Sequence, residues 1–510
     1  MKKYVFSFVV LLATFVLTAC HEESQYRNAL PKDAACVMRF DLGTLADKSG
    51  INASESAVFK ERLSNALKGE FLQSGELVDK IIEDPSETGL ELTDDVYFFI
   101  ESGMTSSGLL IRVSDKSKLE NLLDELVSQH ICSKLIEEEG CMWTTAGNAL
   151  LAYTDDAFMA FVDLMGGEAS SMKHRASMLL RQKTEDSFSS SNDFKALENQ
   201  KGDMVSFFSY DILPQQYKSI TTMGLPADIN LKDAKGIMAL SFEKGKVVID
   251  YKDMTTDKVL KELMEQQRQA ISKTEGTYLD AFSANAFCWL TTNVNGEKLF
   301  AFLKNYPSTR QLFETSMIPV DFEAIFKAIN GDVSFAITDL EQVKFAMYAN
   351  VSNNSFLQTI ENLKPILALT GGQVTLVNKG PHAYEISMQN ADWTGLPPTM
   401  KHLWIGVEED RFYLTNDEPL IKAQVSGKTL KDMEWSKSVD GKYGFMVINF
   451  SALTKLLNSV PSAGSMGALT VLNDIDYCVI EGVEKNASHM ELLMKDRSQN
   501  VLYQILKQFE

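Results

Sequence analysis

The strongest constraint on the fold is an internal repeat with a period of roughly 240 residues. The nine residues Leu92–Ile100 match Ile329–Ile337 at four positions, 237 residues further on. Other matches follow in the same order, at offsets up to 254, among them Asp156-Ala157-Phe158 with Asp410-Arg411-Phe412 and Glu243-Lys244 with Glu484-Lys485. A single large domain with chance similarity is the alternative. We predict a tandem duplication, with one repeat at residues 28–270 and the second at 280–510.

Short runs in which apolar and polar residues alternate indicate β-strands in both repeats. Hairpin turns are expected at Asp155-Asp156, Lys244-Gly245 and Glu409-Asp410. Ser117-x-x-Glu120 and Ser355-x-x-Gln358 match the capping box that begins a helix, and apolar residues at helical spacing follow both. Because strands, hairpins and helices do not alternate strictly, the pattern predicts an α+β fold. We expect a duplicated strand-helix/hairpin unit with largely antiparallel sheets.

The first residues have the order of an export signal. Lys2 and Lys3 precede an uncharged run from Tyr4 to Leu17, which at about 14 residues is short for a transmembrane helix. Leu17-Thr18-Ala19-Cys20 then resembles the lipobox of bacterial lipoproteins. The resemblance implies that residues 1–19 are a signal peptide, that Cys20 receives a diacylglyceryl group, and that residues 20–27 are a short tether. An ordinary cleaved signal with an incidental cysteine is the alternative.

The charge of the chain excludes one class of partner. The formal net charge is −20, and it becomes −22 without residues 1–19, which hold two lysines and no acid. So acidic a chain repels a phosphate backbone, and we expect no binding to nucleic acid. The charge also disfavours spreading on anionic lipid, so contact with the membrane is expected through the N-terminal lipid. The ten residues from His21 to Leu30 span at most roughly 35 Å, which keeps the folded part near the bilayer.

Five cysteines follow Cys20, and two of them are close in sequence. Cys132 ends a helical pattern and Cys141 begins a strand-like run, so a disulfide across the intervening turn is predicted in an oxidising envelope. The other three cysteines lie in apolar runs, where buried free thiols are expected: Cys36, Cys288 and Cys478.

Several segments of the first repeat resemble a known family. Asn28-Ala-Leu-Pro-Lys-Asp-Ala34, Asp41-Leu42, Asp84-Pro85-Ser86 and Tyr97-Phe98-Phe99, at their spacing in the chain, are similar to a family of Bacteroidetes lipoproteins. That family is known as a domain of unknown function (domain of unknown function 4836). The resemblance covers nearly the whole chain. It implies a cell-envelope lipoprotein and supplies no catalytic residue.

Familiar motifs of catalysis and metal binding are missing from the sequence. It contains no His-Glu-x-x-His, no Cys-x-x-Cys and no Gly-x-Ser-x-Gly. Gly427-Lys428-Thr429 ends like a phosphate loop, but Lys422 stands in place of the leading glycine. We therefore predict no cofactor and no metal site, and we name no catalytic residue. The sequence leans against an enzyme without excluding one.

The two repeats differ most in one basic segment. Asp163 to Phe194 spans 31 residues, whereas the matching Asp417 to Trp435 spans 18. The additional residues fall in a stretch whose cations are candidate binding residues for an anionic partner: Lys173, Arg175, Arg181 and Lys183. If this stretch is a helix, one apolar stripe should face the body of the protein: Met172, Ala176, Leu179 and Leu180. A solvated helix without a ligand is the alternative.

Trp393 is a further candidate binding residue. It lies in the Pro/Gly-containing segment Asp392–Pro398, where an exposed indole ring could stack on a sugar or anchor an interface. The alternative is a tryptophan packed under its own loop.

These observations lead to a hypothesis of an outer-membrane lipoprotein, with its leaflet undecided. We expect a non-enzymatic binding or scaffolding role toward an unidentified envelope protein or glycan. The alternative is an envelope hydrolase that cleaves glycan or peptide through a carboxylate pair, which sequence alone cannot reveal. A purely mechanical or assembly role is a third hypothesis. Two convergent carboxylates in a cleft would favour the hydrolase.

Overall fold

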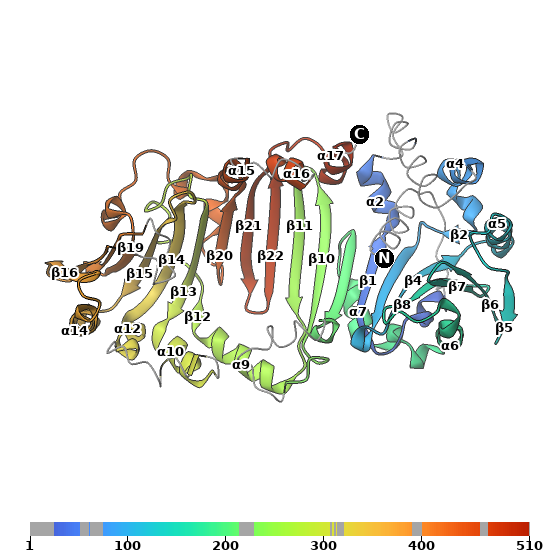
Figure 1. The fold of residues 1–510 in the computed structure, drawn as a ribbon, viewed down its shortest axis with the longest axis horizontal. Helices are drawn as coiled ribbons and strands as arrows, with labels where there is room; N and C mark the ends of the chain where they lie inside the picture. Colours follow the sequence, from blue (N-terminus) through green and yellow to red (C-terminus); the bar gives the residue numbers. More distant parts are fainter. Residues whose placement is uncertain are drawn as a thin grey trace. The chain divides into compact units, whose positions relative to one another are not determined.

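The computed structural model describes residues 25–50, 61, 75–213, 229–306, 309–310, 313, 321–389, 400–458 and 468–508. The described residues divide into two compact units, and Figure 1 labels their helices and strands. Residues up to 213, 230–256 and 497–508 form the first unit, and residues 229 and 257–496 form the second. The division therefore falls before the predicted boundary at 270–280, and the end of the chain belongs to the first unit.

The first unit is built on one antiparallel sheet with the strand order β11-β10-β9-β1-β3-β4-β8-β7-β6-β5. The short β2 pairs with the end of β4. The strands are β1 (Ala34–Asp41), β2 (Leu90–Glu91), β3 (Asp95–Glu101), β4 (Ser106–Val113), β5 (Ile136–Glu138), β6 (Cys141–Ala146), β7 (Ala149–Tyr153), β8 (Ala157–Asp163), β9 (Met204–Ser209), β10 (Lys235–Glu243) and β11 (Lys246–Asp253).

Helices cover both faces of this sheet, because successive side chains of a strand point to opposite sides and both sets are apolar. One side, which we name the α5 face, packs Leu119, Phe158 and their neighbours under α2 (Leu42–Ser49), α5 (Lys116–Ser128) and α17 (Val501–Lys507). The other side, which we name the α6 face, packs Leu110, Met159 and their neighbours under η1 (Gln25–Ala29), η4 (Ala169–Met172), α6 (Lys173–Leu180), η6 (Phe188–Ser190) and α7 (Asn192–Asn199). The remaining helices are α4 (Gly75–Glu83), η2 (Pro85–Thr88), η3 (Ser102–Met104), η5 (Thr184–Asp186) and η7 (Tyr210–Ile212).

The second unit contains a sheet with the order β22-β21-β20-β13-β14-β15-β19-β18-β17-β16, and β12 pairs with β13. Its strands are β12 (Ile271–Ser272), β13 (Cys288–Asn295), β14 (Ile329–Asp339), β15 (Lys344–Val351), β16 (Val374–Gly380), β17 (Ala383–Met388), β18 (His402–Glu408), β19 (Arg411–Thr415), β20 (Phe445–Asn449), β21 (Ile475–Glu484) and β22 (Ala487–Met494). Its helices are α9 (Lys258–Gln269), α10 (Gly296–Asn305), α12 (Phe322–Ala328), η8 (Ser355–Leu357), α13 (Gln358–Glu361), α14 (Lys364–Ala368), η10 (Glu418–Lys422), η11 (Leu430–Asp432), η12 (Glu434–Ser438), α15 (Phe450–Asn458) and α16 (Ala468–Asp474).

The α+β class and the antiparallel pairing are confirmed. The two units also share one strand order: β1 corresponds to β13, β3 to β14, β4 to β15, and so on to β11 and β22. The predicted hairpins form at their predicted turns, as in β7–β8 and β18–β19.

The predicted capping boxes are wrong in detail. The Asp115 carboxylate, rather than Ser117, caps α5 by accepting the backbone N–H groups of Ser117 and Lys118 at 3.0 and 3.1 Å. Asn353 takes the matching place in the second unit, where its side-chain oxygen accepts the N–H of Ser355 at 3.2 Å. A short acceptor two residues before the serine reaches the free amides of the first turn more directly than the serine itself.

The last helix completes the first unit rather than the second. Leu502 of α17 packs on the α5 face, next to the cluster that contains Leu42 and Leu45 of α2. The Asn500 side chain donates to the carbonyl of Phe242 at 2.9 Å, and the Gly245 N–H donates to the carbonyl of Gln499 at 2.8 Å. The end of the chain therefore fixes the β10–β11 turn.

Candidate functional site

The predicted apolar stripe of the basic segment is confirmed. Met172, Ala176 and Leu179 are buried in the core of the α6 face, and Leu180 packs against it. α6 ends at Leu180, so Lys183 lies beyond the helix and is exposed. The sheet strands β6, β7 and β8 support α6 from below.

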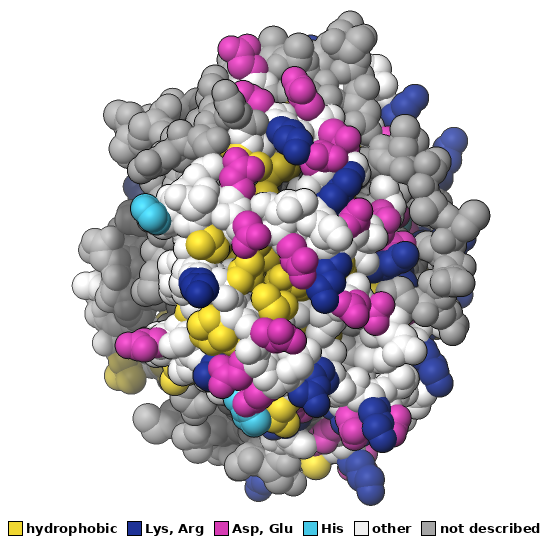
Figure 2. All heavy atoms as spheres, turned by 90° about the vertical axis from the view of Figure 1, so that its right-hand side faces the viewer, with side chains coloured by type: hydrophobic (Ala, Val, Ile, Leu, Met, Phe, Trp, Pro, Cys, Tyr) yellow, Lys and Arg dark blue, Asp and Glu magenta, His cyan; other side chains and the backbone are white. Residues whose placement is uncertain are grey.

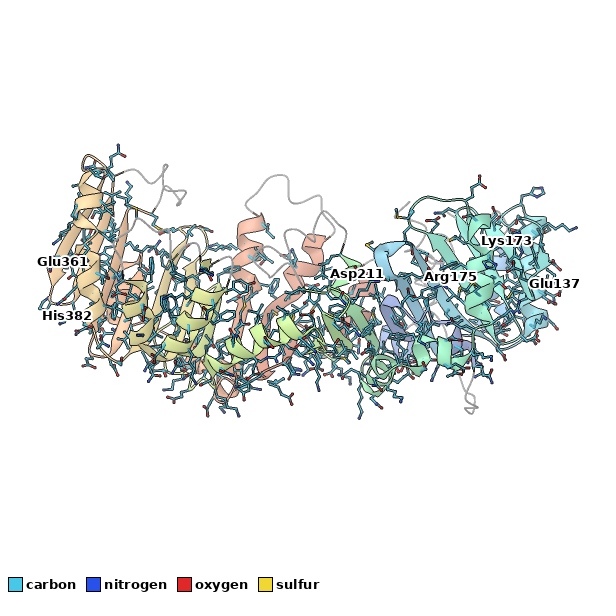
Figure 3. The ribbon with its side chains drawn as sticks, turned by 90° about the horizontal axis from the view of Figure 1, so that it is seen from below. Glu137, Lys173, Arg175, Asp211, Glu361 and His382 are labelled. Carbon is cyan, nitrogen blue, oxygen red and sulfur yellow. The ribbon has the colours of Figure 1, made fainter. Side chains whose placement is uncertain are left out.

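Three of the four predicted cations already have partners on β3, on β5 or in the β5–β6 turn (Figure 3 labels Lys173 and Arg175). The Lys173 ammonium lies 2.6 Å from the Glu138 carboxylate, and the Arg175 Nε donates to Glu101 at 2.8 Å. The Arg181 guanidinium donates to the backbone carbonyl of Glu139. In the described residues Lys183 has no ionic partner. The segment is therefore a paired surface and not an open cluster of positive charge.

The pairing of Arg175 is the most buried of these. Glu101 is 8% exposed and also accepts the hydroxyl of Ser106. Lys173 extends over the Trp143 ring, with 5.5 Å between the ammonium and the ring centre. A hollow of about 10 Å³ beside these residues is lined by Cys141 and Ser177 among others. That volume is close to the minimum for one water molecule, so the hollow does not fit a ligand.

The residues that follow α6 form hydrogen bonds with the first described residues of the chain. The Gln182 amide donates to the Leu30 carbonyl at 2.8 Å, and the Phe188 N–H donates to it at 3.1 Å. Ser189 donates to the Asn28 side chain at 3.0 Å, and Lys32 donates to the Glu185 carbonyl at 2.8 Å. The longer β8–β9 connection of the first unit therefore holds the end of η1 and the residues that follow it.

Two carboxylates of the first unit meet at two arginines. Asp95 lies 3.6 Å from Arg27 and 3.9 Å from Arg39, and Glu198 lies 3.2 Å from Arg27. The Tyr97 hydroxyl donates to Glu198 at 2.8 Å. Burial raises the pKa of Asp95 to about 6; Glu198 also raises it, and the two arginines lower it. The two carboxylates converge on the same two arginines, and each carboxylate side chain stays about one quarter exposed.

Sequence reasoning missed a polar cluster on strands β16–β18 of the second unit, which we name the Glu385 cluster. The Glu385 carboxylate accepts from Lys379 at 2.7 Å, Ser387 at 2.8 Å and His402 Nδ1 at 2.7 Å. The hydrogen bond from Lys379 is the main reason why the pKa of Glu385 falls to about 2. The His402 ring stacks on Trp404, with 5.5 Å between ring centres. The sequence signal that could have revealed this cluster is the pair of motifs His402-x-Trp404 and Glu385-x-Ser387, which lie on neighbouring strands.

The Glu385 cluster contains the residue types of a serine-hydrolase triad without its geometry. Ser387 and Glu385 both approach Nδ1 of His402, at 3.3 and 2.7 Å. A triad requires the serine at one ring nitrogen and the carboxylate at the other. The cluster can instead present a ring and polar groups at the surface, because the side chains of Lys379 and His402 are about half exposed.

The sheet position of the first unit that corresponds to Trp404 is buried. Leu150 pairs with Phe161 there, as Trp404 pairs with Thr415 in the second unit, and Leu150 is completely buried. The connection from β8 to β9 contains α6 and α7, whereas the fully described connection from β19 to β20 contains three short 3₁₀ helices and no α-helix. In the second unit, Leu420, Leu430 and Trp435 of the shorter connection pack in the core of the corresponding face, and Trp404 packs against that core.

Cys132 and Cys141 do not form the predicted disulfide. Cys132 and Cys141 are free thiols in the structure, both buried. Cys132 packs in the core of the α5 face, and Cys141 contacts Ser177 of α6 at 3.8 Å, so they belong to opposite sides of the sheet. Burial raises the pKa of Cys132 to about 11. Cys36, Cys288 and Cys478 are buried free thiols, as predicted.

Cys20 and Trp393 lie outside the described residues, as do residues 1–19. In the part of the chain that the structure describes, no helix combines the length and the apolar character that a membrane span requires. Within the same part, no three His, Cys, Asp or Glu side chains are grouped to hold a metal ion.

Comparison with known proteins places the chain in a family. Crystal forms III and I of TP0453 are similar at 10% sequence identity, with TM-scores of 0.27 and 0.26. The similarity covers 49% and 44% of this chain, and 87% and 77% of that protein. None of the curated proteins matches the sequence. The model of one family, described as a domain of unknown function (DUF4836), matches residues 26–502, and the chain therefore belongs to this family.

Proposed function

We propose that the protein is an outer-membrane lipoprotein of the Bacteroidetes type, anchored through Cys20, with a non-enzymatic binding or scaffolding role. The observation that carries the proposal is the burial of Tyr26 and Leu30, 2% and 0% exposed, directly behind the lipobox-like Leu17–Cys20. A chain that becomes part of a folded core so soon after this cysteine is suited to a lipid anchor on a short tether.

The shared strand order supports an origin by tandem duplication. Tyr26 has its counterpart in Tyr278, 252 residues on, and both are buried at the start of their units. The β-bridge between Pro31 and Ser187 has its counterpart in the bridge between Ser283 and Thr429. A duplicated scaffold provides two similar sheets, of which one is free to acquire a binding surface.

The Glu385 cluster is the binding surface that we assign to the second unit. Its Lys379 and His402 side chains are about half exposed, whereas three of the four predicted cations in the first unit's basic segment already have partners. Stacked rings beside hydrogen-bonding groups suit a glycan, or a polar protein segment, of the cell envelope.

Membrane fractionation tests the anchor. Cys20→Ala should abolish labelling by a fatty-acid probe and release the protein from the membrane, or leave it held by an uncleaved signal. Unchanged labelling would contradict the lipoprotein assignment. For the binding surface, His402→Ala should weaken the capture of envelope material, whereas His382→Ala, at an exposed position outside the cluster, should not.

The convergence of Asp95 and Glu198 favours a second candidate function, an envelope hydrolase. A carboxyl group with a pKa of about 6 is suited to general acid catalysis near neutral pH. The two arginines that contact the pair count against it. Hydrolysis of envelope glycan or peptide that is lost in both Asp95→Asn and Glu198→Gln would support this candidate.

A further inference from the structure

One side of the first unit's sheet carries the beginning of the folded chain. Tyr26 and Leu30 lie in the same core as Met172 and Leu179, and η1 therefore lies on the α6 face. The hydrogen bonds from Gln182 and Phe188 to the Leu30 carbonyl hold it there. The lipid that we propose on Cys20 is therefore connected to the α6 face of the first unit.

The exposed apolar side chains of the first unit lie on elements of the same face. Among the described residues of this unit, four large apolar side chains are exposed, and we name them the apolar patch: Ile136 (42%), Leu164 (44%), Met165 (77%) and Met178 (51%). Figure 2 views this end of the unit, where apolar side chains lie among charged ones.

The position of each patch residue follows from its element. Met178 is on α6, and Leu164 and Met165 connect β8 to η4, which packs on the α6 face. Ile136 pairs with Trp143, the ring that lies under Lys173 of α6. Because cross-strand partners point to the same side of a sheet, Ile136 also belongs to this face.

Two cations beside the apolar patch are paired, Lys173 with Glu138 and Arg175 with Glu101. Two acids, Asp163 and Glu168, flank the segment that contains Leu164 and Met165. Charge therefore does not draw this surface to anionic lipid. Its contact with a membrane would depend on apolar side chains and not on charge.

The length of the tether limits where this face can be. Tyr26 is six positions after Cys20, so their Cα atoms are at most roughly 21 Å apart in an extended chain. A surface tied to the bilayer at that distance, on the side where the tether ends, is within reach of the lipid headgroups.

We propose that the apolar patch is a membrane-docking surface, which lies in the headgroup region of the bilayer that holds the anchor. This inference rests on the proposed lipidation of Cys20. The lipid supplies one attachment and the patch supplies a second, which fixes the orientation of the first unit.

The experiment uses the lipidated full chain in vesicles of phosphatidylethanolamine and phosphatidylglycerol. A polarity-sensitive thiol probe is attached to Met165→Cys or Met178→Cys, because the described native thiols are buried. Asn121→Cys is the matched control, since Asn121 is exposed on α5, on the opposite face of the same sheet. Thermal melting by circular dichroism confirms that each variant is folded.

The expected result is a blue shift of the probe at both methionine positions on vesicle binding, with loss of emission when brominated lipid is included. The probe at Asn121→Cys should show neither, and 0.5 M salt should not reverse the shifts. Probes that remain in water on vesicle-bound, lipidated protein would overturn the docking surface and leave the anchor intact. A chain that carries no lipid and does not sediment with vesicles would overturn both.

Discussion

Asp95 and Asp332 take the same place in the two units and have opposite surroundings. Asp95 is paired with Asp41 across β1 and β3, and Asp332 with Asn293 across β13 and β14. Asp332 is 1% exposed and accepts hydrogen bonds from uncharged donors: the N–H groups of Glu275 and Thr277, the Thr277 hydroxyl and the Asn293 amide, at 2.9 to 3.2 Å.

Asp95 instead lies among charged groups. Arg27 and Arg39 contact it and lower its pKa, whereas Asp41 and Glu198 raise its pKa. One carboxylate is thus held by hydrogen bonds from uncharged donors, whereas the other lies among charged groups. The same strand position can carry an acid with neutral partners in one unit and an acid with ionic partners in the other.

The largest expected effect is at Asp332. Asp332→Ala leaves several donors of the 275–277 segment without an acceptor, and we expect it to lower the free energy of unfolding by about 3 kcal/mol. Asp95→Ala should cost about 1 kcal/mol or less, because burial already disfavours its charge. Urea unfolding, followed by tryptophan fluorescence, measures both. Equal losses would show that the two positions do not differ as described.

The next effect is the pH dependence of the first unit. The folded-state pKa of Asp95 is about 6, above its usual value of 3.8, so the folded state binds the proton more tightly than the unfolded state. Its contribution to stability is therefore complete below about pH 4 and is lost as the pH rises through 6, by about 3 kcal/mol. Asp95→Asn should remove this component from a series of melts between pH 4 and 8. A pH dependence identical to that of the wild type would contradict the assignment.

A third test concerns Arg175, whose partner Glu101 is buried. Arg175→Ala leaves that carboxylate without its ion pair and should lower stability by about 1–2 kcal/mol. Lys173→Ala removes an exposed pair and should cost about 0.5 kcal/mol or less. The free energies of unfolding separate the two cases. A charge reversal across the whole segment should therefore reduce stability as well as any binding.

The smallest expected effect concerns helix capping, which the two units share. Asp115→Ala and Asn353→Ala should each cost about 1 kcal/mol by leaving first-turn amides uncapped. Ser117→Ala should change stability by a few tenths of a kcal/mol at most, because its side chain is not the cap. The denaturation midpoints of the four single variants, Ser355→Ala included, check the comparison. A larger loss at Ser117 than at Asp115 would restore the capping box that the sequence suggested.

The sequence predicted the class and the hairpins because both depend on local patterns. The β7–β8 and β18–β19 turns follow from polar pairs between alternating runs. It also predicted the buried stripe of α6, since Ala176 and Leu179 recur at helical spacing. Its errors concern choices between neighbours: Asp115 caps α5 in place of Ser117, and Cys132 faces away from Cys141 because they pack on opposite sides of a sheet.

Long-range pairing was beyond the reach of sequence reasoning. The residues that neutralise Lys173 and Arg175 lie 35 and 74 positions away, on strands whose order one sequence does not specify. The Glu385 cluster unites three strands in the same way. Such sites depend on which strands become neighbours, and they become visible when the sheet is assembled.

The docking of α17 on the first unit has a consequence for the order in which the chain can fold. Residues from Arg497 on belong to the unit that begins the chain, and Asn500 bonds to Phe242, 258 residues earlier. A ribosome makes a chain from its N-terminus and therefore delivers these residues last. The first unit stays incomplete, with the α5 face uncovered where Leu502 packs, until the whole second unit has been synthesised. Its maturation is a late event, although its residues arrive first.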